Sequence, residues 1–370
     1  RRAVGKSLAP LDKKLQDVEW GEYRLGDSFE IKGNPQLDKD HFVFGEESEF
    51  PYFTRTEFNN GILGYVDYLD EEHKIPSGCL AVGMIAMKFF YMEKDFYAGQ
   101  FTKRAVPKSF TLTPRTAAYF ISILNKNQRA FQNTLVRNFE SMFNNTKVKL
   151  PTKNGGIDFV FMESFIAQLE AERIAELEAY LVASGLKDYT LTKEEKKVLI
   201  DFEKGSVTWD EFNLEKLFGK STRGRRLKSD DRIPGDLPFV TAGEAEQGVS
   251  AYIGNDVVVF SKNTTTIDMF GSAKYRNYEY GGDDHVAVVH TEKLPKYASI
   301  FVTTAIHKSS HNGQFNYGKN FYAKDADKLD IKLPNKNNQP DYDKMDTFIS
   351  AIQKLVIKDI VQYADRKIAA

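Results

Sequence analysis

The segment Leu150-Pro151-Thr152-Lys153-Asn154 returns later in the chain as Leu333-Pro334-Asn335-Lys336-Asn337. The residues that follow match at the same distance of 183 positions: Asp158, Met162, Phe165 and Ile166 correspond to Asp341, Met345, Phe348 and Ile349. An internal repeat of this length indicates one structural unit used twice. The repeat therefore indicates that the chain consists of two equivalent halves.

The repeat continues toward the start of each half, where the distance between copies changes. Trp20 to Phe29 matches Trp209 to Phe218 at 189 positions, and Pro51 to Tyr65 matches Pro238 to Tyr252 at 187. Constant ends with insertions and deletions between them are expected when two domains share a scaffold but differ in their surface loops. We therefore predict two tandem domains of mixed α/β fold, each followed by a long helix.

The predicted limits follow from the repeat. They are a first domain over residues 1–150, a first long helix with its connector over 151–205, a second domain over 206–333, and a second long helix over 334–370. Within the domains, β-branched and aromatic runs predict strands at Leu80 to Ile85, Asp256 to Ser261 and His285 to His290. Helices are predicted at Pro114 to Asn125 and Lys296 to His307, and Thr192 to Glu195 forms a capping box for another short helix.

Composition excludes several classes of protein. Of the 370 residues, 41% are apolar and 28% charged, which suits a folded globular chain with two cores. Cys79 is the only cysteine, so neither an internal disulfide nor a zinc site built from cysteines can form. No long uncharged apolar run or secretion signal occurs, and we expect a cytoplasmic protein without membrane contact. The net charge of −1 argues against a uniformly basic, nucleic-acid-binding surface but permits local basic surfaces.

Each long helix carries one apolar stripe at helical spacing, the first from about Phe159 to Ala183 and the second ending near Lys367. Two equal helices that follow equivalent domains are predicted to pack as an antiparallel coiled coil. The alternatives are that each helix packs only on its own domain, or that its stripe binds another subunit. The residues predicted to pack are Met162, Ile166, Leu169, Leu177, Met345, Ile349, Ile352 and Ile360.

The sequence gives little support for catalysis. It contains no Asn-Pro-Pro-Tyr motif of an amino-group methyltransferase, and Gly219-Lys220-Ser221 lacks the upstream glycine of a nucleotide-binding loop. Asp283-Asp284-His285 is the most site-like acidic cluster, but it is better interpreted as a turn that leads into a strand. His307 and His311 have no evident third ligand. We therefore predict no catalytic residue, no bound metal and no cofactor in this chain.

Binding to nucleic acid has better support, because basic and hydroxyl side chains gather in loops. Residues 220–228 hold five basic residues in nine positions, and arginine can both neutralise phosphates and bind guanine. An ordinary solvated loop is the alternative interpretation. The predicted DNA-binding residues are Thr54, Arg55, Lys88, Lys103 and Arg104 in the first domain, and Lys220, Arg223, Arg225, Arg226, Lys228, Lys262, Asn263, Thr264 and Arg276 in the second.

These features together carry a family likeness. Val18-Glu19-Trp20 through Phe29 and Val207-Thr208-Trp209 through Phe218 each open a domain that closes with Leu-Pro-x-Lys-Asn and a long helix. Leu237 to Glu244 and the turn Asp268 to Ala273 add to it. The chain resembles the DNA specificity subunit of Type I restriction-modification systems, or the related subunit of Type IIB and fused Type II enzymes. The likeness covers nearly the whole chain.

The resemblance implies a subunit without catalytic activity whose two target-recognition domains each read one half of a split double-stranded DNA sequence. The long helices would set the distance between half-sites and bind methyltransferase subunits, with restriction subunits as further partners and S-adenosylmethionine held by the methyltransferase. An antiparallel helix pair also suits duplex DNA, because it relates the two domains by an approximate two-fold axis. Two alternatives remain: the recognition half of a fused nuclease-methyltransferase, and a tandem scaffold that binds proteins.

Overall fold

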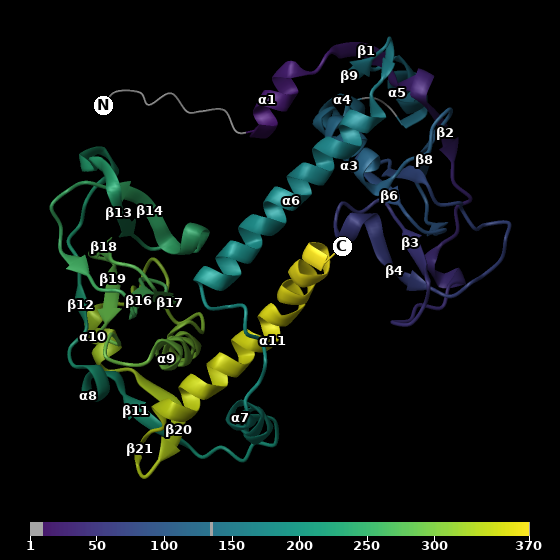
Figure 1. The fold of residues 1–370 in the computed structure, drawn as a ribbon. Helices are drawn as coiled ribbons and strands as arrows, with labels where there is room; N and C mark the ends of the chain where they lie inside the picture. The colour runs from purple at the N-terminus through teal and green to yellow at the C-terminus, as the bar shows by residue number, and fades with distance from the viewer. Residues whose placement is uncertain (1–9, 134–135, 370) are drawn as a thin grey trace. The chain divides into compact units, whose positions relative to one another are not determined.

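The computed structural model describes residues 10–133 and 136–369. The chain divides into two compact units, Arg1–Leu177 and Glu178–Ala370. Figure 1 labels the helices and strands of both. This division falls inside the first long helix, near its end. The four domain ranges given above stay a prediction.

The first unit contains a mixture of short strands and helices, followed by one long helix. Its elements are α1 (Pro10–Asp17), β1 (Trp20–Arg24), α2 (Leu25–Ser28), β2 (Phe29–Gly33), η1 (Lys39–His41), β3 (Phe50–Phe53), η2 (Asn59–Gly61), β4 (Ile62–Val66), β5 (Cys79–Gly83), β6 (Phe89–Met92), β7 (Tyr97–Ala98), β8 (Thr102–Pro107), α3 (Pro114–Lys126), α4 (Gln128–Gln132), η3 (Val136–Asn138), α5 (Phe139–Asn145), β9 (Lys147–Lys153), β10 (Gly156–Ile157) and α6 (Phe159–Ala183).

The second unit contains the last turn of α6 and, without a counterpart of α4 and η3 among its described residues, repeats most of the same order of elements. They are α7 (Lys193–Glu203), β11 (Trp209–Asn213), α8 (Leu214–Phe218), β12 (Thr222–Arg223), η4 (Ser229–Asp231), β13 (Pro234–Val240), η5 (Ala245–Gly248), β14 (Val249–Ile253), β15 (Val259–Phe260), β16 (Thr264–Asp268), β17 (Ala273–Arg276), β18 (Tyr280–Gly282), β19 (Val286–Val289), α9 (Lys296–Ser310), α10 (Ala323–Asp327), β20 (Asp330–Lys336), β21 (Gln339–Pro340) and α11 (Tyr342–Ala369).

The strand order is the same in both units. The first has sheets β1-β9-β10, β2-β8-β5-β6 and β4-β3-β7, and the second has β11-β20-β21, β12-β19-β16-β17 and β14-β13-β18-β15. In place of β15 the first unit has a single antiparallel bridge between Ile75 and Phe96. In both units one pairing is parallel, β3 with β7 and β13 with β18. The predicted α/β class and the predicted duplication are thus confirmed at the level of topology.

The two repeated sequence segments of each half pair with each other. Trp20 lies opposite Pro151 in the antiparallel pair β1–β9, and Trp209 lies opposite Pro334 in β11–β20. The register agrees at all five positions of both pairs. The segment that opens each domain and the segment that closes it, 117 or more residues apart in sequence, therefore form one small sheet beside the start of the long helix.

Local chemistry explains the other repeated residues. Asn154 and Gly155, and likewise Asn337 and Asn338, have positive φ angles and make the two-residue turns β9–β10 and β20–β21. Asn and Gly are favoured in such hairpins because they tolerate the left-handed region. The following aspartates then cap the long helices. Asp158 Oδ1 accepts from the backbone N–H of Phe161 at 2.8 Å, and Asp341 does the same for Lys344 at 3.0 Å.

The predicted helices agree closely with the structure. The first long helix has the predicted bounds, and the predicted helices at 114–125 and 296–307 are α3 and α9. Thr192 and Glu195 form the predicted capping box of α7. The strands are shorter than predicted: the run at 256–261 yields only the two residues of β15, because Asn255 and its neighbours form a loop.

Each unit has its own core. In the first, Phe29, Phe89, Phe120, Phe139 and Phe143 are fully buried beneath α3 and the β2-β8-β5-β6 sheet. In the second, α9 packs against the equivalent sheet and α11 packs against α9. Met162 and Met345, the predicted packing residues nearest the domains, are both fully buried in these cores. No helix in the described ranges is long and apolar enough to cross a membrane.

Most of α6 belongs to the first unit, whereas its last residues, from Glu178, belong to the second unit together with α11. Within the second unit, Leu181 in the last turn of α6 is fully buried. Lys187 holds this turn against α11, since its Nζ lies 2.6 Å from both Glu178 and Asp365. The coiled coil over the whole length of the helices, including Ile166, Leu169, Leu177, Ile352 and Ile360, stays a prediction.

Candidate nucleic-acid interface

A cleft of about 520 Å³ opens at one end of the first domain, where three loops meet. The β3–β4 loop supplies Thr54, Arg55 and Thr56, the β5–β6 loop supplies Ile85, and the segment after β7 supplies Gly99 and Gln100. Two of the predicted DNA-binding residues, Thr54 and Arg55, thus lie in one cleft. The remaining lining residues are Asp38, Lys39, Tyr52 and Leu63.

Two contacts join the β3–β4 and β5–β6 loops that border this cleft. Lys88 Nζ lies 3.1 Å from Glu57 Oε2 and so joins the β5–β6 loop to the β3–β4 loop. A Cβ on Gly83 would stand 2.7 Å from the Cα of Arg55, which means that only glycine permits the two backbones to lie this close. Lys88, predicted to contact DNA, therefore also forms an ion pair with the loop that carries Arg55.

Left-handed backbone residues that are not glycine gather in the same loops. Asn59 and Asn60 in the β3–β4 turn, Met87 before β6 and Phe101 after β7 all have φ between 48° and 57°. In the second domain, Glu246 and Gln247 adopt the same conformation as Asn59 and Asn60, at φ of 46° and 55°. Such residues cost conformational energy and concentrate at functional sites. Both domains keep this turn although its residues differ.

The second domain has different side chains at the positions equivalent to the cleft. Ala242 stands at the position of Arg55 and Asp268 at the position of Gly83. Lys274 Nζ lies 3.2 Å from Glu244 and 3.5 Å from Asp268, so it joins the same two loops that Lys88 joins in the first domain. Hydrogen bonding to Ser272 and the nearby Lys274 lower the pKa of Glu244. The sequence did not reveal Lys274, because it is the second residue of β17, whereas Lys88 directly precedes the equivalent strand β6.

Three residues predicted to bind DNA have structural roles instead. Arg276 is 1% exposed, and its Nε donates to Thr266 Oγ1 at 2.9 Å and its Nη1 to Tyr278 Oη at 3.0 Å. Thr264 is fully buried and bonded to Ser261 O. The amide of Asn263 donates to Leu294 O at 2.8 Å and accepts from Tyr275 Oη. Their polar groups are occupied inside the domain, so we withdraw them from the predicted interface.

Two residues of the first domain also have internal partners. Arg104 donates to Gly33 O at 2.8 Å and to Asn34 Oδ1 at 2.7 Å, which ties β8 to the end of β2. Lys103 lies 3.9 Å from Glu140. Both side chains are partly exposed, so they could contact a ligand only while they also keep their internal partners.

The basic segment 220–228 lies at the edge of the second domain. Thr222 and Arg223 form β12, which pairs with β19, and Gly224 is buried against Gly282 so closely that a Cβ there would stand 1.6 Å from the Gly282 oxygen. This contact fixes the start of the loop that follows. The basic residues of the segment are exposed, as is Lys262, and within the described ranges none of them forms an ion pair: Lys220, Arg223, Arg225, Arg226 and Lys228.

Comparison with known proteins identifies the family. The model of the Type I restriction modification DNA specificity domain matches residues 17–179 and again 206–362. The chain belongs to this family. It is similar to the specificity subunit S.BcgI of the Type II restriction enzyme BgcI from Heyndrickxia coagulans, with 22% identity over 92% of this chain and 96% of that protein. Its fold also resembles the crystal structure of the Type I restriction-modification S subunit from M. genitalium, with a TM-score of 0.60, 13% identity, and 95% and 93% of the two chains covered.

This specificity subunit of a restriction-modification system thus has two tandem recognition domains, and each matched family segment includes most of the long helix that follows its domain. The basic segment of the second domain has no matching basic run in the first, and in the cleft of the first target-recognition domain Arg55 corresponds to Ala242 of the second copy. Surface loops that vary on a constant scaffold are where recognition is expected.

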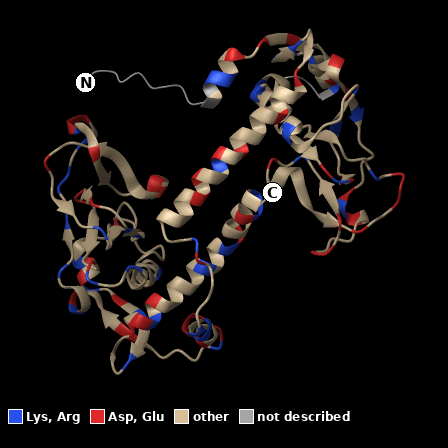
Figure 2. Cartoon of the chain, viewed as in Figure 1, with Lys and Arg blue, Asp and Glu red and all other residues tan. Residues whose placement is uncertain are grey.

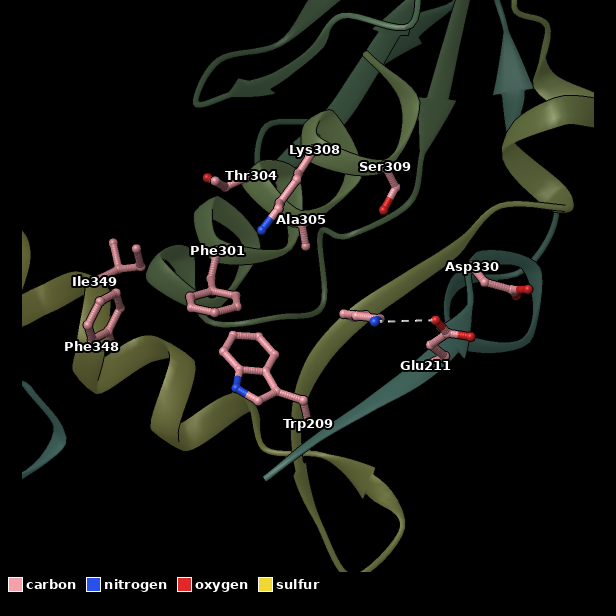
Figure 3. A pocket seen from close by; sticks show the side chains of 11 residues that line it. Trp209, Glu211, Phe301, Thr304, Ala305, Lys308, Ser309, Asp330, Phe348 and Ile349 are labelled. Carbon is pink, nitrogen blue, oxygen red and sulfur yellow. Dashed lines mark ion pairs between the residues drawn. The ribbon is translucent and has the colours of Figure 1, made fainter. Parts of the chain in front are cut away.

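A second cavity, of about 580 Å³, lies beside the first turns of α11 rather than among the loops (Figure 3). Trp209, Phe301 and Phe348 line one side of it, and Lys308 points toward it from α9. Glu211 carries the ion pair drawn in the figure, at 3.8 Å from Lys332. In the first domain Ile123 stands at the position of Ala305, so the second domain has less side-chain volume here. The repeated Trp209 packs against the rings of Phe202 and Phe301 and remains 46% exposed.

Asp283, Asp284 and His285 bring three ligand atoms within 4.8 Å of one another, a spacing that could hold a metal ion, so their interpretation as a turn stays a prediction. His285 Nδ1 lies 2.8 Å from Asp284 Oδ1, and burial raises the pKa of Asp283, which leads into β19 as predicted. His307 Nδ1 accepts from the backbone N–H of Ala273 at 3.1 Å, and burial lowers its pKa. Burial also raises the pKa of Cys79 to about 12, which disfavours its thiolate.

Proposed function

We propose that this chain is the non-catalytic DNA-reading subunit of a restriction-modification complex. It would bind double-stranded DNA with two target-recognition domains, each reading one half of a bipartite sequence. The observation that carries the proposal is the double family match together with two copies of one topology whose loops differ. Two readers with different loops would read two different half-sites.

The catalytic steps would belong to the partners. Methyltransferase subunits, holding S-adenosylmethionine, would modify the target, and restriction subunits would cut unmodified DNA. The long helices would provide the binding surface and fix the gap between half-sites. Their charges suit a pair: α6 contains five glutamates and one arginine, whereas α11 contains four aspartates and five lysines and arginines (Figure 2). A net −4 on one helix and +1 on the other favours association.

Exposed apolar residues on α11 support the same role. Val356 is 71% exposed, and Ile360 and Tyr363 are also exposed on the helix. Exposed apolar side chains grouped on one element indicate a binding surface. Replacing both Leu177 and Ile360 with glutamate should weaken assembly with the methyltransferase subunit, measured by size-exclusion chromatography. Unaltered assembly and stability would remove the stripe from the proposal.

Neutralisation of the basic segment tests the DNA-binding role. Arg223→Ala, Arg225→Ala and Arg226→Ala together should lower affinity for duplex DNA and reduce the slope of log affinity against log salt by up to about 3, since each phosphate contact contributes about 0.9. The matched control replaces three exposed lysines of the same unit on α7: Lys193, Lys196 and Lys197.

The control should leave affinity nearly unchanged. A tandem scaffold that binds only proteins would show no salt-dependent binding to duplex DNA in any of these variants. Equal losses from the α7 triple and the arginine triple would show general charge attraction rather than a defined interface.

A further inference from the structure

The cleft of the first domain exposes large apolar side chains beside an arginine. Leu63 is 55% exposed, Ile85 63% and Phe101 52%, and the first two line the cleft. Arg55 lies over the ring of Phe101, with its guanidinium carbon 5.6 Å from the ring centre. Apolar side chains that stay exposed in this way, next to a cationic group, form a surface suited to a ligand with both apolar and acceptor groups.

These side chains are held in place by buried neighbours. Met84 and Met87 on either side of Ile85 are 4% and 2% exposed, and the oxygen of Ala86 accepts from Gln128 at 2.6 Å and from Gln132 at 3.0 Å. The loop therefore has little freedom, and Ile85 is held outward by an anchored backbone. Pre-organised side chains lose little conformational entropy when a ligand binds.

Phe101 is held in a similar way. Its backbone N–H donates to Gln36 Oε1 at 3.1 Å, its oxygen accepts from the N–H of Met84 at 2.9 Å, and its φ is 57°. The ring in turn supports the guanidinium of Arg55, which forms no ion pair or hydrogen bond with any other described residue. Its planar donors are therefore free for a ligand, unlike those of Arg276, which are used inside the second domain.

We infer that this cleft reads a thymine next to a guanine in the major groove of the first half-site, an inference that rests on the proposed function. The C5 methyl group is the one apolar feature of the major-groove base edges, and Leu63 and Ile85 would contact it. Arg55 would donate to O6 and N7 of the guanine, the acceptor pair that an arginine fork fits. Gln100 and Thr56, on the same cleft, supply further donors toward neighbouring bases.

The second domain cannot read DNA in this manner. Ala242 replaces Arg55, and Asp268, which stands at the position of Gly83, forms an ion pair with Lys274. The thymine-guanine step is therefore expected in one half-site through this cleft, and the other half-site depends on different side chains. This asymmetry makes the inference testable within a single protein.

The test begins with selection of binding sites by the full chain, alone and with the methyltransferase subunit of its own system, from a random pool of duplex DNA. The expected result is a bipartite motif. Arg55→Ala should alter only one half of it, and that half should contain a thymine beside a guanine. Arg226→Ala, the matched variant in the second domain, should leave this half unchanged.

Two modified duplexes then test the contacts separately. Replacing the thymine with deoxyuridine removes only the methyl group and should weaken wild-type binding about fourfold, the effect of one buried methyl. Replacing the guanine with 7-deazaguanine should weaken it about tenfold or more. The Leu63→Ala, Ile85→Ala variant should bind the thymine and deoxyuridine duplexes equally, and Arg55→Ala should no longer distinguish guanine from 7-deazaguanine.

Each variant is compared with itself on two duplexes, so partial unfolding would affect both measurements alike. A motif half altered by Arg55→Ala but lacking thymine would overturn the inference, as would deoxyuridine binding equal to thymine binding in the wild type. An Arg55→Ala variant with an unchanged motif would overturn it too. In these three cases the proposed function stands, whereas absence of any selected motif with or without the partner would overturn both.

Discussion

Lys88 and Glu57, 31 residues apart in the sequence, form an ion pair at 3.1 Å that joins two loops of the first recognition domain. Lys274 and Glu244 form the corresponding pair at 3.2 Å in the second. The glutamates are equivalent in the repeat, but the lysines are not. An ion pair therefore joins the two loops in both domains although the lysine comes from a different position. This indicates that the relative position of these loops matters for recognition.

Glu57→Ala should reduce DNA binding more than it reduces stability. Both side chains of the Glu57–Lys88 pair are at least one-third exposed, so loss of the pair should cost at most about 1 kcal/mol of unfolding free energy. The loosened β3–β4 loop should lower affinity for the cognate duplex several-fold. Urea unfolding and a binding titration measure the two effects.

The control is Glu30→Ala, which breaks the exposed Glu30–Lys32 pair on β2, also at 3.1 Å. It should change neither quantity appreciably. If Glu57→Ala behaves like this control in the binding titration, the loop tie has no role in recognition.

The repeat allowed the fold to be predicted in unusual detail, because each of its residues has a local role. Asn154 makes a turn that needs a left-handed residue, and Asp158 caps a helix, so their pattern identifies a strand, a turn and a helix start. The pairing of Trp20 with Pro151 was not predicted, because no local signal specifies a partner more than 120 residues away.

The interface was predicted less well, because a basic residue in sequence does not reveal its own partners. Arg55 and Arg276 are both in loops or strand ends rich in polar residues, yet one is free and the other is buried beneath Gly248 and Tyr280. Exposed apolar residues such as Ile85 were missed entirely, since an isolated apolar residue in sequence usually indicates a core. The positive φ values that mark these loops are visible only in the structure.

Arg276→Ala should destabilise the second unit rather than act on DNA contacts directly. The change leaves the hydroxyls of Thr266 and Tyr278 without their partner in a buried site, at a cost of about 1 to 3 kcal/mol. Arg55→Ala, at an exposed arginine, should change the unfolding free energy by less than about 0.5 kcal/mol. Urea unfolding followed by fluorescence compares the two, and equal stability of both variants would contradict the buried role of Arg276.

Ala305→Ile should stabilise the second unit by about 0.5 to 2 kcal/mol, because it places in the cavity of about 580 Å³ the residue that the first domain uses at Ile123. The reverse change, Ile123→Ala, should destabilise the first unit. Thermal unfolding measures both. A loss of stability with Ala305→Ile would show that the cavity wall formed by Trp209 and Phe301 cannot accommodate the added methylenes.

Glu195 should make the contact between α7 and α11 sensitive to acid. Burial acts to raise its pKa, but hydrogen bonds from the backbone of Thr192, from Ser350 and from Lys354 outweigh this and lower the pKa below its usual 4.5. A lowered folded-state pKa contributes stability that is complete above the unfolded value and is lost as pH falls through the folded value.

Stability should therefore decline below about pH 4.5 in part through Glu195. Glu195→Gln should lower the unfolding free energy at pH 7 by about 1 to 3 kcal/mol and make the decline less steep. Urea unfolding at several pH values measures this, with Glu194→Gln on the exposed side of α7 as the control. Parallel pH profiles for the wild type and Glu195→Gln would exclude this group as a cause.

Mapping of methylated bases in a host that expresses the complete system tests the central claim most directly. The account predicts a bipartite motif with a fixed gap, whose two halves differ in sequence and one of which changes when Arg55 is replaced with alanine. A continuous motif without a gap, or methylation that does not depend on this chain, would contradict the account.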